Sequence, residues 1–230
     1  DGRTIYADLD ALDIPNATML TNDDGATGVT FSVALAKEYD NGVGFQLSYA
    51  NQDVEYVSEG SSSRGISNWR GIVAADRNFP ESRTAIYQTE HSFKLNLSYE
   101  NEFFYDLTSR FDLFGQVFSG DPFTYTFDVS NSNSLFGRAG LGEGPFDNSP
   151  LYIPTESDPN VVYASGFDQA AFNAFIEENG VPRGGINAVN EDSGPWTQRW
   201  DFRFQQELPG IPGVDRFVGD NRFKFVLDIE

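Results

Sequence analysis

The chain has 230 residues, of which 39% are hydrophobic and 15% aromatic, enough for one large β domain or two small ones. Its formal net charge of −20 excludes a general nucleic-acid binder, because a phosphate backbone would be repelled. There are no cysteines, which excludes disulfides, thiolate metal sites and cysteine nucleophiles together. The 22 glycines and 11 prolines are typical of a β protein with many turns and loops. The sequence contains no run of 18 apolar residues, so it predicts no transmembrane helix.

The first quarter of the chain predicts three strands. Residues 3–9 predict a short strand, and residues 10–26 a loop. Apolar and polar residues then alternate over 27–39, which predicts a second strand with one apolar face. Asp40-Asn41-Gly42 predicts a tight turn, because Asn-Gly accepts positive φ at low cost, and a third strand follows over 43–57.

The middle of the chain predicts a long polar loop, a strand, a short connection and another strand. In order, these segments are residues 58–84, 85–99, 100–107 and 108–118. Within the loop, residues 72–75 predict one turn of helix. The last of these strands is expected to extend as far as Tyr125.

The remainder of the chain begins with its longest irregular segment, residues 128–195. Inside it, apolar residues at spacings of three and four predict an amphipathic helix over 167–179, with Gly180 at its end. A strand, a connection of middle length and a final strand are then predicted at residues 196–207, 208–220 and 221–230.

The strand over 196–207 has two contrasting faces. Trp200, Phe202 and Phe204 occupy every second position, and charged or strongly polar residues lie between them. The connections also alternate between long and short, as they do in outer-membrane barrels. We therefore expect about seven antiparallel strands of a larger transmembrane β-barrel, with rings facing lipid and charges facing a water-filled lumen. The charged residues expected to face the lumen are Arg199, Asp201, Arg203, Arg222, Lys224 and Asp228.

Several stretches also carry a family resemblance. They include Phe93-Lys94-Leu95-Asn96-Leu97-Ser98-Tyr99, Gly120-Asp121-Pro122-Phe123-Thr124-Tyr125-Thr126-Phe127 and Phe223-Lys224-Phe225-Val226-Leu227-Asp228-Ile229-Glu230. Over residues 80–230 the chain resembles the C-terminal barrel region of Oar-like TonB-dependent outer-membrane receptors, most specifically at 108–127 and 196–230.

The resemblance implies a receptor or transporter that moves or binds a substrate at the surface of a Gram-negative cell. It implies location in the outer membrane, contact with lipid and lipopolysaccharide, and coupling to the TonB energy-transducing complex. Barrels of this class have about 22 strands. Residues 1–230 are therefore expected to form a partial barrel domain with long loops at 58–84 and 128–195. The plug domain, the TonB box and the final strands are expected to be absent from it.

Aromatic residues in the predicted loops are the candidates for contact with an unknown ligand: Trp69, Phe123, Tyr125 and Tyr152. No catalytic residue, cofactor or metal is expected, and the protein is not expected to be an enzyme. His91 is the single histidine, and the sequence contains no catalytic motif around it.

Two alternatives are open. The first is a secreted or surface β-sandwich that binds carbohydrate or protein. The second is a glycoside hydrolase using a carboxylate pair such as Asp23-Asp24, Glu177-Glu178 or Glu191-Asp192. Asp158, Asn160 and Asp192 are weighed as calcium ligands, but the EF-hand spacing is absent.

Overall fold

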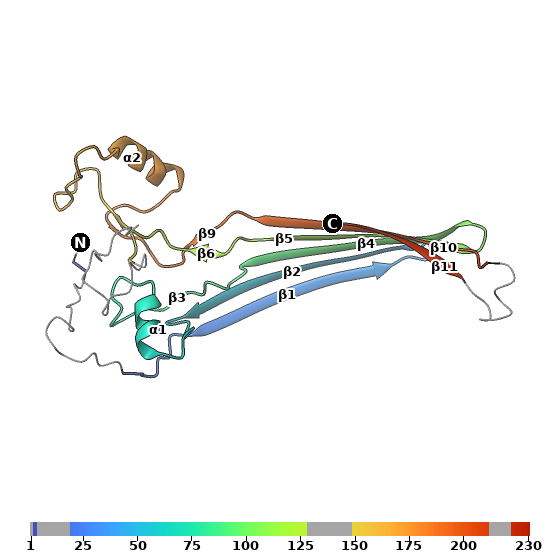
Figure 1. Ribbon diagram of the computed structural model, residues 1–230, viewed down its shortest axis with the longest axis horizontal. Coiled ribbons are helices and arrows are strands. Elements are labelled where there is room, and N and C mark those ends of the chain that lie inside the picture. The colour runs from blue at the N-terminus through green and yellow to red at the C-terminus, as the bar shows by residue number, and fades with distance from the viewer. Residues whose placement is uncertain (1, 4–18, 128–148, 212–221) are drawn as a thin grey trace. The chain divides into compact units, whose positions relative to one another are not determined.

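The computed structural model describes residues 2–3, 19–127, 149–211 and 222–230 (Figure 1). The described residues form mostly antiparallel β-sheet with two short helices, which confirms the all-β prediction. They divide into two compact units. The sheet unit comprises Gly28–Asp53, Tyr87–Asp121 and Gly194–Glu230, and the loop unit comprises Asp1–Thr27, Val54–Ile86 and Pro122–Ser193.

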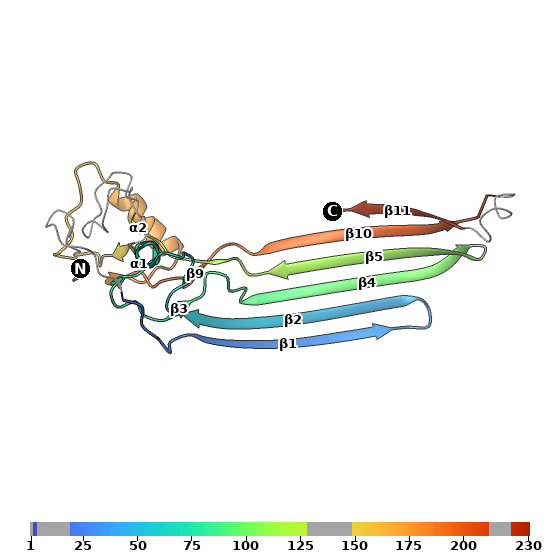
Figure 2. The same ribbon diagram turned by 60° about the horizontal axis from the view of Figure 1, so that its bottom comes forward.

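Six long strands lie side by side in the sheet unit, in the same order as in the chain (Figure 2). They are β1 (Thr27–Glu38), β2 (Val43–Tyr56), β4 (His91–Phe104), β5 (Leu107–Phe118), β10 (Thr197–Leu208) and β11 (Phe223–Ile229). The short strand β3 (Arg83–Thr84) pairs with the end of β2. Because β1 and β11 lie at the two ends of this order, the sheet is open in the part of the chain that the structure describes.

The sequence predicted the long strands well. Five of the predicted strands, at 27–39, 43–57, 108–118, 196–207 and 221–230, match long strands to within two residues at each end. Of the predicted strand at 3–9, residues 4–9 lie outside the described residues.

The two tight turns lie at one end of the sheet. The turn after β1 is closed by a hydrogen bond from Tyr39 N to Val43 O at 2.8 Å. Gly42 has φ of +83°, and a Cβ there would lie 1.9 Å from the carbonyl oxygen of Glu100, so glycine is required. The prediction of a connection over 100–107 was wrong. A register shift after Asn101 lets β4 continue to Phe104, and only two residues join it to β5.

Three other boundaries differ from prediction. The strand expected at 85–99 begins at His91, because Ala85 N bonds to Val54 O and the chain then leaves the ladder until Glu90. The strand expected to reach Tyr125 ends at Phe118, and β6 (Pro122–Phe123) pairs instead with β9 (Asp192–Ser193). The helical turn predicted at 72–75 is also wrong, since helix α1 (Gly65–Gly71) ends at an extended Ile72.

The loop unit has its own small core. Ile153, Ile176 and Val181 are buried together, and four partly buried side chains pack around them: Tyr125, Leu151, Phe172 and Phe175. Helix α2 (Gln169–Glu178) confirms the predicted helix. Its first turn is capped by the Asp168 carboxylate, which accepts a hydrogen bond from Ala171 N at 2.9 Å. The pair β7 (Tyr152–Ile153) and β8 (Gly185–Ile186) completes this core.

Candidate functional site: a sheet with one aromatic and one charged face

The register of the sheet places apolar side chains of neighbouring strands directly opposite one another. Phe204 of β10 lies opposite Phe111 of β5 and Leu227 of β11. Directly opposite residues of an antiparallel pair point to the same face. One face therefore carries rings and aliphatic chains on β2, β4, β5, β10 and β11, and we call it the apolar face. On β2, β4 and β5 it is formed by Val43, Phe45, Leu47, Tyr49, Phe93, Leu95, Leu97, Tyr99, Phe111, Leu113, Gly115 and Val117.

Solvent reaches much of this face. Leu47 is 48% exposed, and Phe225 is 50% exposed. Within the described residues of the sheet unit, the strands form one layer, with no second sheet over either face (Figures 1 and 2). In water, a sheet of one layer would expose a contiguous apolar surface far larger than monomeric soluble proteins usually expose. The apolar face is therefore the candidate contact surface of the sheet.

The charged face is defined by the residues between the rings. Arg203 of β10 lies opposite Asp112 of β5 and opposite Asp228 of β11. Its guanidinium donates two hydrogen bonds to Asp228, with Nε to Oδ1 at 2.6 Å and Nη2 to Oδ2 at 3.1 Å. This two-point geometry is the strongest form of an arginine–carboxylate pair.

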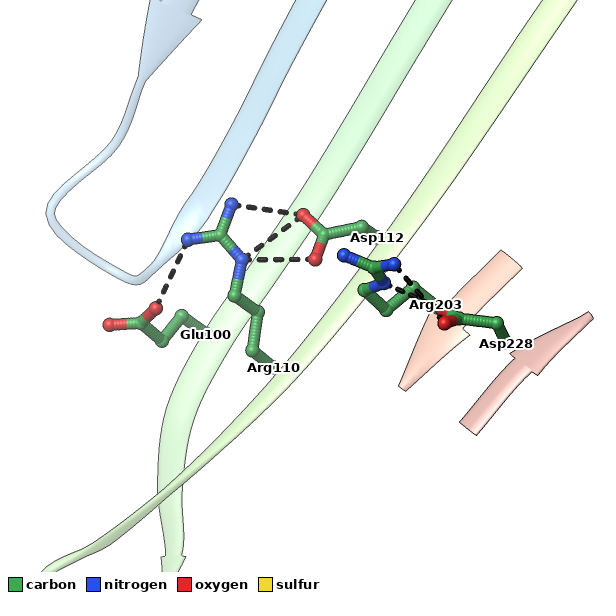
Figure 3. Close-up of polar contacts among 5 residues, drawn as sticks. All are labelled: Glu100, Arg110, Asp112, Arg203 and Asp228. Carbon is green, nitrogen blue, oxygen red and sulfur yellow. Dashed lines mark hydrogen bonds and ion pairs between the residues drawn. The ribbon is translucent and has the colours of Figure 1, made fainter. Parts of the chain in front are cut away.

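The same row continues onto β4 (Figure 3). Arg110 donates to Asp112, two positions further along β5, with Nε at 3.0 Å from Oδ2. Its Nη1 reaches Glu100 of β4 at 3.4 Å. Signs therefore alternate across four strands, and we call this row the charge ladder: Glu100, Arg110, Asp112, Arg203 and Asp228.

Five of the six charged residues expected to face a lumen share this face by register: Arg199, Asp201, Arg203, Lys224 and Asp228. Arg222 directly precedes β11, and a lumen beside them stays a prediction. Arg199 contacts Asp201 at 3.1 Å and Glu230 at 3.8 Å, and Arg222 contacts Glu207 at 3.3 Å. Lys224 lies opposite Glu207. Sequence reasoning missed the part of the ladder on β4 and β5. The period-two spacing of Arg110 and Asp112 was the available signal for it.

A second polar cluster surrounds the single histidine, where β4 begins. Nδ1 of His91 lies 3.0 Å from Oη of Tyr49 and 3.2 Å from Nδ2 of Asn51. Its ring stacks on Trp196 with centroids 5.9 Å apart. Its other ring nitrogen, Nε2, lies 3.4 Å from the carboxylate of Glu90. These contacts hold the imidazole in place at the start of β4.

The four aromatic ligand candidates all lie in the loop unit, but they do not form one group. Phe123 and Tyr125 meet edge to face, with ring centroids 5.0 Å apart. Tyr152 donates a hydrogen bond from Oη to Asp158 at 2.6 Å. Trp69 lies in helix α1, and its Nε1 donates a hydrogen bond to Asn78 Oδ1 at 3.0 Å. Each ring has a packing role within the loop unit, so their part in ligand binding stays a prediction.

Asp158 and Asp192, two of the residues weighed as calcium ligands, are engaged in separate contacts. Asp158 accepts from Tyr152 and from the backbone of Asn160 at 3.0 Å, whereas Asp192 lies 3.4 Å from Asn187. Among the described residues, no three His, Asp or Glu side chains gather as metal ligands would. No helix in the described ranges has the length and hydrophobicity needed to cross a membrane.

Comparisons with protein-family models, curated proteins and solved structures each found no match.

Proposed function

We propose that this chain is part of the barrel wall of an Oar-like TonB-dependent outer-membrane receptor. In this proposal the apolar face contacts lipid, and the charge ladder lines a water-filled lumen. The protein moves or binds a substrate at the surface of a Gram-negative cell, without catalysing a reaction on it. The receptor class rests on the sequence resemblance, and the membrane wall rests on the geometry of the sheet.

The separation of the two faces is the observation that carries the membrane part of the proposal. Rings and aliphatic chains occupy one face of five neighbouring strands, β2, β4, β5, β10 and β11. The other face carries the arginine–carboxylate pairs of β4, β5, β10 and β11, together with three apolar side chains, Phe114, Phe118 and Val226. A soluble sandwich buries the apolar face of each sheet against a second sheet. In lipid, the same face is solvated by hydrocarbon and needs no second layer.

The placement of the connections gives further support. Both tight turns, after β1 and after β4, leave one end of the sheet, and the long connections after β2 and β5 leave the opposite end. Outer-membrane barrels have this asymmetry, with short turns on the periplasmic side and long loops outside. The loop unit, built from the long connections, would then be the extracellular part that meets the ligand.

The experiment is membrane fractionation of the full-length protein in a Gram-negative host. We expect it in the outer-membrane fraction, resistant to alkaline extraction, and folded only when detergent or lipid is present. Recovery as a soluble monomer without detergent would overturn the membrane proposal and favour the surface binding module. Dependence on the energy-transducing complex is tested separately, by comparing substrate accumulation in cells with and without a functional TonB protein. Equal accumulation would overturn the receptor class alone.

A further inference from the structure

Two rows of polar side chains cross the apolar face, one near each end of the strands. The loop-side row consists of Asn51, His91 and Ser119, and the turn-side row consists of Asn101, Ser109 and Gln206. Within each row the residues are neighbours on adjacent strands, except that Ser119 directly follows the end of β5, where its N donates to His91 O at 2.9 Å. Polar side chains therefore interrupt this face at two levels, and each level spans three strands.

Hydrogen bonds link the three residues of the loop-side row and two of the three residues of the turn-side row. In the loop-side row, Asn51 Nδ2 lies 3.2 Å from His91 Nδ1, and His91 N donates to Ser119 Oγ at 3.1 Å. In the turn-side row, Ser109 Oγ donates to Gln206 Oε1 at 2.5 Å. The polar groups at these levels thus satisfy part of their own hydrogen-bonding capacity, and water or headgroups can supply the remainder.

Between the rows, the face is free of charge on β2, β4 and β5. Four successive positions on each strand carry only apolar side chains, glycine or tyrosine. On β4 these positions are Phe93, Leu95, Leu97 and Tyr99. Hydrocarbon requires such a composition, because a charged side chain at the middle of a bilayer costs about 2–4 kcal/mol.

The distance between the rows fits the thickness of a bilayer core. The rows lie ten residues apart on β4, from His91 to Asn101, and along β5 from Ser109 to Ser119, the residue after its end. At about 3.3 Å per residue, this is roughly 33 Å along the strand. Barrel strands tilt by about 40°, which reduces the height to about 25 Å, the height of the apolar band of outer-membrane barrels.

Amphipathic rings lie at both levels. Trp196, Tyr49 and His91 gather at the loop-side row. At the turn-side row, Tyr99 Oη accepts a hydrogen bond from Asn101 Nδ2 at 2.9 Å. Tyrosine and tryptophan prefer the headgroup level, where one end of the ring is in hydrocarbon and the polar atom is in water. Trp200 lies opposite Gly115, four residues closer to the turns than the loop-side row at Ser119. Trp196 is therefore the better marker of the boundary between hydrocarbon and headgroups.

The band also shifts along the strands from β5 to β11. On β10, polar Gln198 lies opposite Val117, one position closer to the turns than the loop-side row on β5. On β11, Phe225 lies opposite Gln206, so the apolar positions there continue past the level of the turn-side row. Both shifts run in the same direction. Strands that are tilted against the membrane normal produce a shift of this kind.

We propose that bilayer hydrocarbon covers this sheet between the two rows and that lipid headgroups meet it at Asn51, His91 and Ser119 on one side and at Asn101, Ser109 and Gln206 on the other. The inference rests on the proposed membrane location and adds the depth of each residue. It assigns the single histidine a place at the headgroup level. The occupant of the apolar face is lipid, as opposed to a second copy of the chain.

The test uses the absence of cysteine from the sequence, which makes single-cysteine labelling clean. Variants Leu97→Cys, Asn96→Cys, Ser119→Cys and Asn101→Cys of the full-length protein are spin-labelled and reconstituted in phosphatidylcholine vesicles. Accessibility to oxygen, which concentrates in hydrocarbon, is compared with accessibility to a water-soluble nickel chelate. Leu95→Cys and His91→Cys serve as second variants where a first one fails to fold.

We expect high oxygen and low nickel accessibility at Leu97, the reverse at Asn96, and intermediate values at Ser119 and Asn101. Nickel access at Leu97 equal to that at Asn96 would overturn the membrane proposal together with this inference. Labels at Ser119 and Asn101 as deep as Leu97 would overturn the assignment of the rows and leave the membrane proposal standing. A label at Leu97 shielded from both reagents, with spin–spin broadening between molecules, would identify a second copy as the occupant.

Discussion

The indole ring of Trp200 covers Gly115, its direct neighbour across β5 and β10. A Cβ at residue 115 would lie 2.3 Å from one carbon of that ring and less than 3 Å from two more. A large ring beside glycine on the neighbouring strand fills the space that the missing side chain leaves, and this fixes the position of the tryptophan.

Gly115→Ala should therefore destabilise the sheet by about 1–3 kcal/mol, because the ring must leave its position. Thermal unfolding followed by tryptophan fluorescence measures the loss. Gly28→Ala is the matched control, since Gly28 is also a strand glycine and no atom lies within 4 Å of the place that a Cβ would take there. Equal effects of the two variants would contradict the packing role of Trp200.

Leu97→Arg tests which face meets lipid. Leu97 lies in the middle of the apolar band, so an arginine there should oppose membrane insertion by about 2–4 kcal/mol. Its neighbour Asn96 points to the opposite face, and Asn96→Arg should be tolerated. The amount of folded protein in the outer membrane is measured for both variants. Equal amounts of the two would contradict the assignment of the faces.

Exchange of Arg203 and Asp228 tests the charge ladder. Arg203→Asp alone should weaken the β10–β11 pairing, because it places two carboxylates directly opposite each other. The double variant Arg203→Asp with Asp228→Arg should recover part of the loss, since the pair is restored in reverse. Unfolding midpoints of the two single variants and the double variant give the coupling. A coupling no larger than that of Arg199 with Glu230, which lie 3.8 Å apart, would remove any special role for this pair.

Asn190 joins the two long connections within the loop unit. Its Nδ2 donates to Thr84 O at 2.8 Å, and its Oδ1 accepts from Thr124 Oγ1 at 3.0 Å. Its φ is +59°, a conformation that asparagine and glycine tolerate best. Asn190→Ala should destabilise the loop unit by about 2–4 kcal/mol, because it removes buried hydrogen bonds and strains the backbone.

Asn190→Gly separates these two causes, since glycine relieves the backbone strain and leaves the hydrogen bonds missing. Amide hydrogen exchange of the loop unit should rank wild type, glycine and alanine in decreasing order of protection. If the alanine variant were as protected as wild type, the joining role would be wrong. The sheet strands provide the internal control.

Acid and alkali should both loosen the contact between Tyr152 and Asp158. The hydrogen bond from Tyr152 lowers the pKa of Asp158, and the same bond raises the pKa of Tyr152. In the unfolded chain these groups titrate at about 3.9 and 10. The contribution of Asp158 is present above about pH 4 and is lost as pH falls through its lowered pKa. The contribution of Tyr152 is present below about pH 10 and is lost as pH rises through its raised pKa.

Carboxyl chemical shifts of Asp158 as a function of pH measure the acid limb. Tyr152→Phe should move the midpoint of that titration upward, toward the ordinary value for aspartate. An unchanged midpoint would show that the backbone donor from Asn160 sets the pKa by itself.

The alternation of side chains was sufficient to predict five of the six long strands and their two faces, whereas both bounds predicted for β4 were wrong. Period two is a local property, so Trp200, Phe202 and Phe204 could be assigned to one face without knowledge of any partner strand. The Asn-Gly turn was predictable for the same reason, because it depends on the backbone preferences of two adjacent residues. Helix α2 followed from its spacing and from the glycine after it.

Only the tertiary structure decided which residues lie opposite one another. The alignment of Arg203 with Asp112 and Asp228, and the place of Gly115 under Trp200, depend on the register between strands that are many residues apart in the chain. The two polar rows on the apolar face depend on that register as well. Alternation fixes a strand's faces but leaves shifts by two residues equivalent, and hydrogen bonds and side-chain contacts between strands select one of them.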